Sequence, residues 1–274
     1  MSIVDFILNL AGLLLWLNWR SIHFDPLVKR LPATLMGTLR PAAPDKFRRW
    51  HLLALIVGLV ILRAAAYRWV APLWVFKLDF GVVALPFYSN SFGGMVLFSF
   101  LSFGLTLGIF YLVLLLLSLL KGPEPIHRFV KISLGRVDDW SAPVKIILPF
   151  LVTAIFWGVL GAVLGGLQIF TPANSVGLRI EQAVVIALGV YLVWKFPLAL
   201  LLGLHLLNSY IYFGKHPFWN YVNVAAQKLL SPLNKISLRV GRVDFAPVLG
   251  LVLVFLIAVA AEKGLHELYR RLPI

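Results

Sequence analysis

The sequence contains no cysteine and few charged residues, and each scarcity excludes a class of protein. Without cysteine the chain can form no disulfide, no thiolate-bound iron–sulfur cluster, no zinc finger and no covalent haem c attachment. Charged residues make up 13% of the 274 residues and hydrophobic residues 61%, which is more apolar material than a soluble domain can bury. The composition therefore predicts an integral membrane protein.

Acidic residues are scarcer than basic ones, with 11 Asp and Glu against 25 Lys and Arg, and the formal net charge is +14. The basic residues gather in the gaps between apolar runs, and no strand pattern of aromatic and basic residues indicates nucleic-acid binding. The positive-inside rule explains the excess charge better, because basic loops stay in the cytoplasm beside anionic lipid headgroups. We therefore expect membrane lipids as partners and no nucleic acid.

Catalytic and metal-binding motifs are also missing from the sequence. It has no P-loop, Rossmann, zincin or nucleophile-elbow pattern, and its histidines have no carboxylates at metal-ligand spacing. We therefore expect no enzyme activity and no metal site. No cofactor is predicted, although haem or chlorophyll stays open.

The apolar runs are long enough to cross a bilayer, which takes about 20 helical residues. They predict an all-α, polytopic membrane protein with interfacial amphipathic helices and about six spans: Ile3–Trp19, Leu52–Trp74, Phe92–Leu120, Val144–Phe170, Ile180–Phe213 and Ala246–Ala261. The first run contains Asp5 and Asn9 and either spans or lies in the interface, which would leave five spans. The fifth is overlong and is expected to tilt or to kink at Pro197.

Loop charge predicts the orientation of these spans. With the N-terminus outside, the loops near residues 20–50, 121–143 and 214–245 fall on the cytoplasmic side and hold most of the basic residues. This arrangement predicts a multi-pass protein of the bacterial inner membrane or its plastid-type equivalent.

An internal repeat organises the rest of the chain. The octapeptide Lys-Ile-Ser-Leu-Gly-Arg-Val-Asp at residues 131–138 returns at residues 235–244 with two residues inserted after its leucine. In both copies Ala-Pro-Val follows and opens an apolar run, where proline fits because a first-turn N–H has no intrahelical partner. The repeat predicts four segments: a two-span region with a long basic loop (1–91), a first repeat (92–170), a second repeat (180–261) and a short tail (262–274).

Each repeat is predicted to contain a tight turn between a basic amphipathic stretch and a span. The residues of the two turns are Gly135, Arg136, Asp138, Asp139 and Pro143 in the first copy, and Gly241, Arg242, Asp244 and Pro247 in the second. The glycines permit the turn, and the aspartates either accept backbone N–H bonds or pair with the neighbouring arginines. We favour this structural turn over an acid–base or ion site.

A turn of the form Gly-x-Val-Asp-x-x-Pro after a basic amphipathic stretch resembles the YggT family of membrane proteins. The second copy, about residues 184–260, carries the better match, and residues 92–163 carry a weaker one. Ala246 replaces the family's serine, and Arg136 and Arg242 replace its second glycine. The resemblance implies a small bacterial or plastid-type membrane protein without known catalysis, whose relatives are linked to cell division, osmotic tolerance and assembly of cytochrome complexes.

The segment after Pro217 has the spacing of an amphipathic helix in the membrane interface. Phe218, Trp219 and Val222 are expected to face the lipid, and Lys228 the headgroups. Such a helix is either a linker that anchors the spans or a docking platform for a partner or an anionic lipid.

Three ionisable side chains interrupt the apolar runs, where burying a charge is costly. Arg63 either snorkels outward or has a function. Lys195 precedes Pro197 and is expected to satisfy carbonyl oxygens that the kink frees, which makes it the best candidate for a transport or regulatory residue. His205 is either a hydrogen-bonded residue between helices or an axial ligand of haem or chlorophyll.

Three functions follow from these patterns. The leading hypothesis is a noncatalytic protein that assembles or organises a membrane protein complex, with other membrane proteins as its partners. The first alternative is a channel or transporter subunit that uses Lys195 and Arg63. The second is a cofactor-holding subunit of a respiratory or photosynthetic complex that uses His205.

Overall fold

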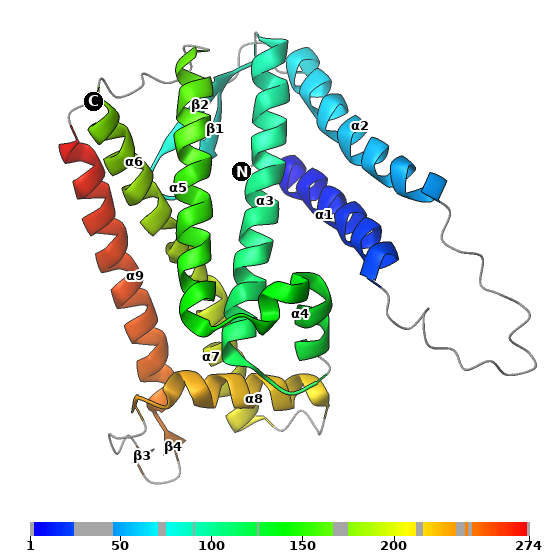
Figure 1. The fold of residues 1–274 in the computed structure, drawn as a ribbon. Helices are drawn as coiled ribbons and strands as arrows, with labels where there is room; N and C mark the ends of the chain where they lie inside the picture. Colours follow the sequence, from blue (N-terminus) through cyan, green and yellow to red (C-terminus); the bar gives the residue numbers. More distant parts are fainter. Residues whose placement is uncertain are drawn as a thin grey trace, which may run out of the picture. The chain divides into compact units, whose positions relative to one another are not determined.

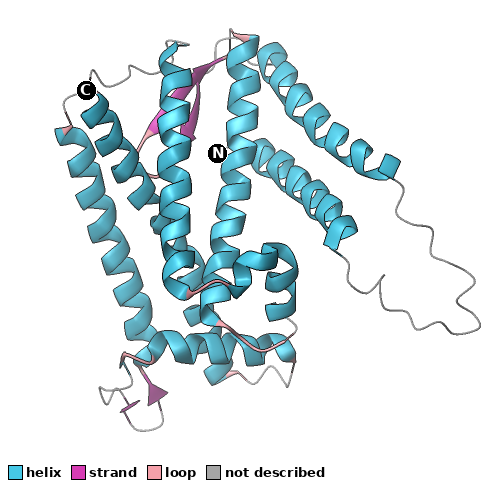
Figure 2. Ribbon diagram, in the orientation of Figure 1, coloured by secondary structure: helices cyan, strands magenta, loops and turns pink. Residues whose placement is uncertain are grey.

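The protein is predominantly helical, and short strands occur in two places (Figures 1 and 2). The computed structural model describes residues 3–24, 46–70, 75–89, 91–124, 126–166, 175–211, 216–233, 239–240 and 243–272. The chain forms two compact units. The first comprises Met1–Leu78 and Pro86–Gly108, and the second comprises Asp79–Leu85 and Ile109–Ile274.

The first unit contains α1 (Ile3–Phe24), α2 (Lys46–Val70) and the beginning of α3 (Phe92–Leu120). Helix α1 packs against α2, and α2 contributes a buried stripe that recurs every fourth residue: Leu52, Ile56, Val60 and Ala64. A four-residue spacing keeps side chains on one helical face. Helix α1 also approaches α3 closely, because a Cβ atom at Gly12 would lie 2.7 Å from the ring of Phe103.

A hairpin that the sequence interpretation missed follows α2. Strands β1 (Val75–Asp79) and β2 (Ala84–Tyr88) pair with each other in a region predicted to be an outer loop. Gly81 has a φ of 86°, which only glycine adopts freely, and its N–H donates to Asp79 Oδ1 at 2.7 Å. The two strands alternate buried and exposed residues, the pattern of a half-buried strand.

The second unit holds the remaining elements. In chain order they are the end of α3, α4 (Ile126–Leu134), η1 (Gly135–Asp139), α5 (Ala142–Gly166), α6 (Val176–Gly189), η2 (Val190–Trp194), α7 (Lys195–Tyr210), α8 (Pro217–Leu230), β3 (Arg239–Val240), β4 (Val243–Asp244) and α9 (Ala246–Arg271). Helix α5 packs on α6, and α9 packs on α6, α7 and α8. Figure 1 shows α8 lying crosswise to α5 and α9.

Among the described residues, six helical segments are long and apolar enough to cross a membrane: Ile3–Arg20, Trp50–Trp69, Phe92–Leu120, Ala142–Gly166, Val176–Tyr210 and Ala246–Arg271. The predicted class, a multi-pass helical membrane protein, is therefore confirmed by length and composition. Helices suit this setting because they satisfy their own backbone hydrogen bonds, which lipid cannot do.

Two boundaries differ from the predicted segments. Helix α9 runs to Arg271, so the last candidate span continues past its predicted end at Ala261. The compact units also divide within α3, so the predicted first repeat (92–170) is split between them, whereas the second repeat (180–261) belongs to the second unit. Both copies do place their Ala-Pro-Val triplet at a helix start, since α5 begins at Ala142 and α9 at Ala246.

The fifth span is broken before Pro197 by the 3₁₀ segment η2. Pro197 has no N–H to donate to the carbonyl oxygen of Val193, and the N–H of Lys195 donates to that oxygen instead. The backbone therefore satisfies this carbonyl by itself. The expectation that the ammonium group of Lys195 would do so is wrong.

Candidate functional site

Arg63 is the centre of a buried polar cluster in the first unit. Its Nη2 lies 2.5 Å from Asp5 Oδ1, and its Nη1 donates to Asn9 Oδ1 at 2.8 Å. Ser102 Oγ accepts from Arg63 Nη2 at 3.1 Å and from Asn9 Nδ2 at 3.0 Å, and Tyr67 also donates to Asp5. Arg63, Asp5 and Asn9 are all at least 96% buried. The alternative that Arg63 snorkels outward is therefore wrong, and α1 is tied to α2 by its polar residues.

The cluster can hold charge at membrane depth because its cation and anion neutralise each other. The guanidinium group also lies over aromatic rings, with Arg63 Cζ 5.2 Å from the centre of Phe98 and 5.6 Å from that of Tyr67. A buried ion pair of this kind is costly to break, because removing one partner strands the other charge. The arrangement serves the fold of the first unit.

A second buried cluster joins Lys145 to the turn of the first repeat. Lys145 Nζ donates to Ser118 Oγ at 2.7 Å and to the carbonyl oxygen of Asp138 at 2.6 Å, and it lies 3.9 Å from Asp138 Oδ1. Ser118 Oγ in turn donates to Asp138 Oδ1, and His127 Nε2 lies 3.8 Å from Asp138 Oδ2. Lys145, Ser118 and Asp138 come from α5, α3 and η1, so the cluster fixes three elements to one another.

Sequence reasoning missed Lys145 and Ser118. Lys145 lies in the first turn of α5 and is 1% exposed. The available signal was its position seven residues after Asp138, across the junction between turn and span. Ser118 in a leucine-rich run carried no signal, because the contact joins residues 27 apart in the chain.

The first predicted turn forms, but its aspartates use other partners than expected. Gly135 has a φ of 62°, which explains the need for glycine. Asp138 is paired with Lys145 and not with Arg136, which is exposed, and Asp139 lies 3.5 Å from Lys131 on the surface. Pro143 occupies the first turn of α5.

The second predicted turn is only partly described by the structure. Gly241 and Arg242 lie outside the described residues, and Asp244 contributes its backbone to β4, which pairs with β3. Pro247 is buried in the first turn of α9. The two copies thus end in different local structures, a 3₁₀ turn in the first and a two-residue strand pair in the second.

Lys195 begins α7 and forms an ion pair with α9. Its Nζ lies 3.0 Å from Glu262 Oε2, with the lysine side chain 22% exposed and the glutamate side chain 49% exposed. Lys195 lies about 22 Å along α7 from Tyr210, and Glu262 about 24 Å along α9 from Ala246. Both residues belong to candidate membrane spans, Val176–Tyr210 and Ala246–Arg271.

His205 connects α7 to the crosswise helix α8. Its Nδ1 lies 2.9 Å from Asn223 Oδ1, and Asn208 Nδ2 donates to the same oxygen at 3.1 Å. The structure thus places His205 in a hydrogen bond between helices. Its Nε2 is the ring nitrogen left for an axial ligand, so the haem or chlorophyll hypothesis stays a prediction.

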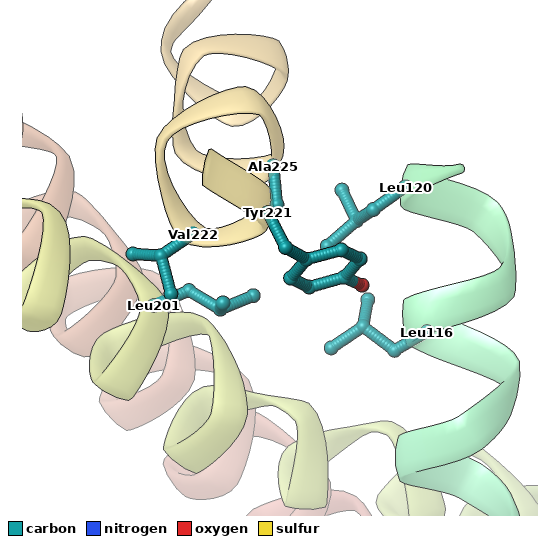
Figure 3. Packing of buried hydrophobic residues seen from close by; sticks show 6 residues of the cluster. All are labelled: Leu116, Leu120, Leu201, Tyr221, Val222 and Ala225. Carbon is teal, nitrogen blue, oxygen red and sulfur yellow. The ribbon is translucent and has the colours of Figure 1, made fainter. Parts of the chain in front are cut away.

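Helix α8 packs part of its apolar face against the protein, so the expectation that Val222 would face the lipid is wrong. Tyr221, Val222 and Ala225 pack with Leu116 and Leu120 of α3 and Leu201 of α7 in one buried cluster (Figure 3). Phe218 is exposed and Trp219 is half-buried. The ring of Tyr221 leaves no space for a side chain at Gly122, where a Cβ atom would lie 2.0 Å from the ring.

Two polar groups of α8 lie at the end of α3. Lys228 Nζ donates to the carbonyl oxygens of Leu120 and Lys121, each at 2.7 Å, so it caps α3 instead of facing headgroups as expected. Figure 3 shows the hydroxyl group of Tyr221 pointing toward Leu116 and Leu120, and it has no hydrogen-bond partner within the described part of the chain. Burial raises the pKa of Tyr221 to about 12.

Within the residues that the structure describes, no group of three or more histidine or acidic side chains is placed to hold a metal ion. The Arg63–Asp5 and Lys145–Asp138 pairs are buried, whereas the Lys195–Glu262 pair is partly exposed. Comparison of the chain with family models, with curated proteins and with solved structures finds no match.

Proposed function

We propose that this protein is a noncatalytic, multi-pass membrane protein that assembles or organises a membrane protein complex through the exposed side of α9. The observation that carries the proposal is the Lys195–Glu262 ion pair between two candidate membrane spans, in which the glutamate side chain is 49% exposed. Charge in contact with hydrocarbon is costly, and intramembrane charges face protein or water. A neighbouring protein that covers the pair would remove this cost.

The surroundings of the pair are open to such a neighbour. In the most apolar stretch of α9, 11% is buried inside the protein, against 39% in the most apolar stretch of α3. Exposed apolar side chains on α9 are Val248, Val252, Phe255, Leu256, Ile257 and Val259. Lipid alone could cover these apolar residues, so the charged pair among them is the feature that favours a protein partner.

Helix α5 offers a second open face. A Cβ atom at Gly158 or Gly161 of this helix would meet nothing within 4 Å. Small residues let helix backbones approach each other closely in membranes. The open glycine face is therefore compatible with a helix supplied by another protein.

The two alternatives receive less support. A transport path needs charge that can be reached from water, whereas Arg63 is buried against Asp5 and Lys195 is neutralised by Glu262. A cofactor-holding role through His205 rests on one histidine that already contacts Asn223. An absorption spectrum of the purified protein tests that role directly.

Photo-cross-linking in native membranes tests the proposal. A photoreactive residue at Leu256 of α9, which is 61% exposed, should give a discrete protein adduct, and mass spectrometry should identify one partner. The matched control is Leu62 of α2, also a leucine and 71% exposed, which should give only lipid adducts. Glu262→Gln should reduce the adduct at Leu256.

Two outcomes would contradict the proposal. Equal lipid labelling at both positions would mean that no protein covers α9. An adduct that contains two copies of this chain would assign the face to self-association and remove the argument for a complex with other proteins.

A further inference from the structure

Helix α4 lies against the side of α3 and not beyond its end. Its buried residues Val130 and Leu134 pack on Leu114 and Leu115 of α3. These two leucines precede the end of α3 at Leu120 by about 8 Å of helix. Because α3 is a candidate span, α4 lies in the zone where the apolar layer meets the headgroups.

The opposite face of α4 is exposed and carries aromatic and basic side chains. Phe129 is 47% exposed, and Trp140, just after η1, is 44% exposed. Arg128 on α4 and Arg136 on η1 are exposed as well. Aromatic rings favour the membrane interface, and arginine at the same depth favours phosphate.

The two arginines form no ion pair with the described residues. The acidic residues nearest to Arg136 already have other partners, since Asp138 is bonded to Ser118 and Lys145, and Asp139 lies 3.5 Å from Lys131. The Lys131–Asp139 pair is exposed on both sides and therefore weak. Two guanidinium groups thus remain without an anion at the depth of the lipid phosphates.

We propose that the exposed face of α4 and η1 binds anionic phospholipid headgroups through Arg128 and Arg136, with Phe129 and Trp140 embedded beside the upper acyl chains. The inward face of α4 is fixed to α3, so the lipid meets a surface that is already formed. A basic residue near an anionic membrane surface contributes about a fivefold preference, which gives about 25-fold for two arginines. This inference does not depend on what covers α9.

Lipid selectivity of the full-length protein tests the proposal. The protein is reconstituted in a mixture of phosphatidylcholine and phosphatidylglycerol, and the lipids that it retains are counted by native mass spectrometry. The wild type should retain phosphatidylglycerol preferentially, and the Arg128→Gln/Arg136→Gln variant should lose most of that preference. The control Lys263→Gln/Arg270→Gln removes two exposed cations from α9 and should keep it.

A second measurement, the apparent melting temperature, tests the proposal on the wild-type protein and therefore does not depend on how well the glutamine variant folds. Added phosphatidylglycerol should raise the apparent melting temperature of the wild type and of the charge-conserving Arg128→Lys/Arg136→Lys variant, because a ligand of the folded state stabilises it. The proposal is overturned if phosphatidylglycerol gives the wild type no such rise. It is equally overturned if the glutamine variant keeps the wild-type preference, or if the α9 control loses as much.

Discussion

Lys145→Met removes an ammonium group that is 1% exposed and that donates to Ser118 Oγ and to the carbonyl oxygen of Asp138. The carboxylate of Asp138 would then stay buried without its cation. Breaking a buried ion pair by removing one partner costs about 3–5 kcal/mol in soluble proteins. We expect a loss of that order in the free energy of unfolding, and a similar one for Asp138→Asn, which strands the lysine.

The double variant Lys145→Met/Asp138→Asn separates the ion pair from the other contacts. It leaves no unpaired charge, so we expect it to lose about as much as one single variant and not the sum of both. The coupling free energy should then be about as large as one single loss, about 3–5 kcal/mol, at or above the upper end of the range for residues in direct contact. Part of the loss should persist, because the hydrogen bond to the backbone of Asp138 is gone in every variant that lacks Lys145.

The assay is equilibrium unfolding of the purified protein in one detergent, with the surface pair of the same residue types as the control. Lys131 and Asp139 lie 3.5 Å apart, closer than the 3.9 Å of the buried pair, but their side chains are 59% and 67% exposed. Lys131→Met and Asp139→Asn should each change stability by less than about 1 kcal/mol. Additive losses in the buried cycle, or equal losses at the surface pair, would refute the reasoning that burial makes the difference.

Three further predictions concern Tyr221. Tyr221→Phe removes a buried hydroxyl group that has no partner among the described residues and should leave stability unchanged or raise it by up to about 1 kcal/mol, whereas Tyr221→Ala should cost about 3–5 kcal/mol in unfolding measurements. Gly122→Ala should cost about 1–3 kcal/mol because its Cβ would lie 2.0 Å from the Tyr221 ring, and the cost should fall in a Tyr221→Ala background. Because burial raises the pKa of Tyr221 from 10.0 to about 12, the unfolded state loses this proton first, so stability should fall between pH 10 and 12 and Tyr221→Phe should lessen that fall.

The spans could be predicted because a helix that crosses a bilayer must be about 20 residues long and largely apolar, and both properties can be read from the sequence. The end of the last span could not, because Glu262 and Lys263 look like the polar border of a membrane helix. The helix continues past them, and Glu262 forms an ion pair with Lys195 from a segment 67 residues earlier. A local sequence pattern cannot predict an ion pair between residues so far apart in the chain.

In the polar clusters, too, features that depend on neighbouring residues could be predicted, and contacts between distant residues could not. The need for glycine at position 135 follows from the turn itself and could be predicted. The partners of Asp138 and Arg63 could not, because helix packing alone brings Lys145 and Asp5 to them. The hairpin β1–β2 is a different case, since its alternating residues and Gly81 carried a local signal that the interpretation overlooked.

The Lys145 and Lys195 pairs differ in burial, which is why we propose that the first stabilises the fold and the second contacts a partner. The Lys145 pair is sealed, with side chains 2% and 4% exposed, whereas those of the Lys195 pair are 22% and 49% exposed. Exposed charge on a membrane span is costly, so a neighbouring protein that covers the Glu262 side chain would stabilise a complex.

Because the Lys195–Glu262 pair is partly exposed, Glu262→Gln should lower the unfolding free energy of the isolated protein less than Asp138→Asn does, while it lowers the yield of partner adducts at Leu256. Asp138→Asn should lower the unfolding free energy strongly. Among the molecules that remain folded, it should leave the yield of adducts at Leu256 unchanged. Both variants are measured in parallel by unfolding in detergent and by cross-linking in native membranes. If Glu262→Gln destabilised the isolated protein as strongly as Asp138→Asn and left cross-linking intact, the pair would belong to the fold, and the main argument for a partner on α9 would be lost.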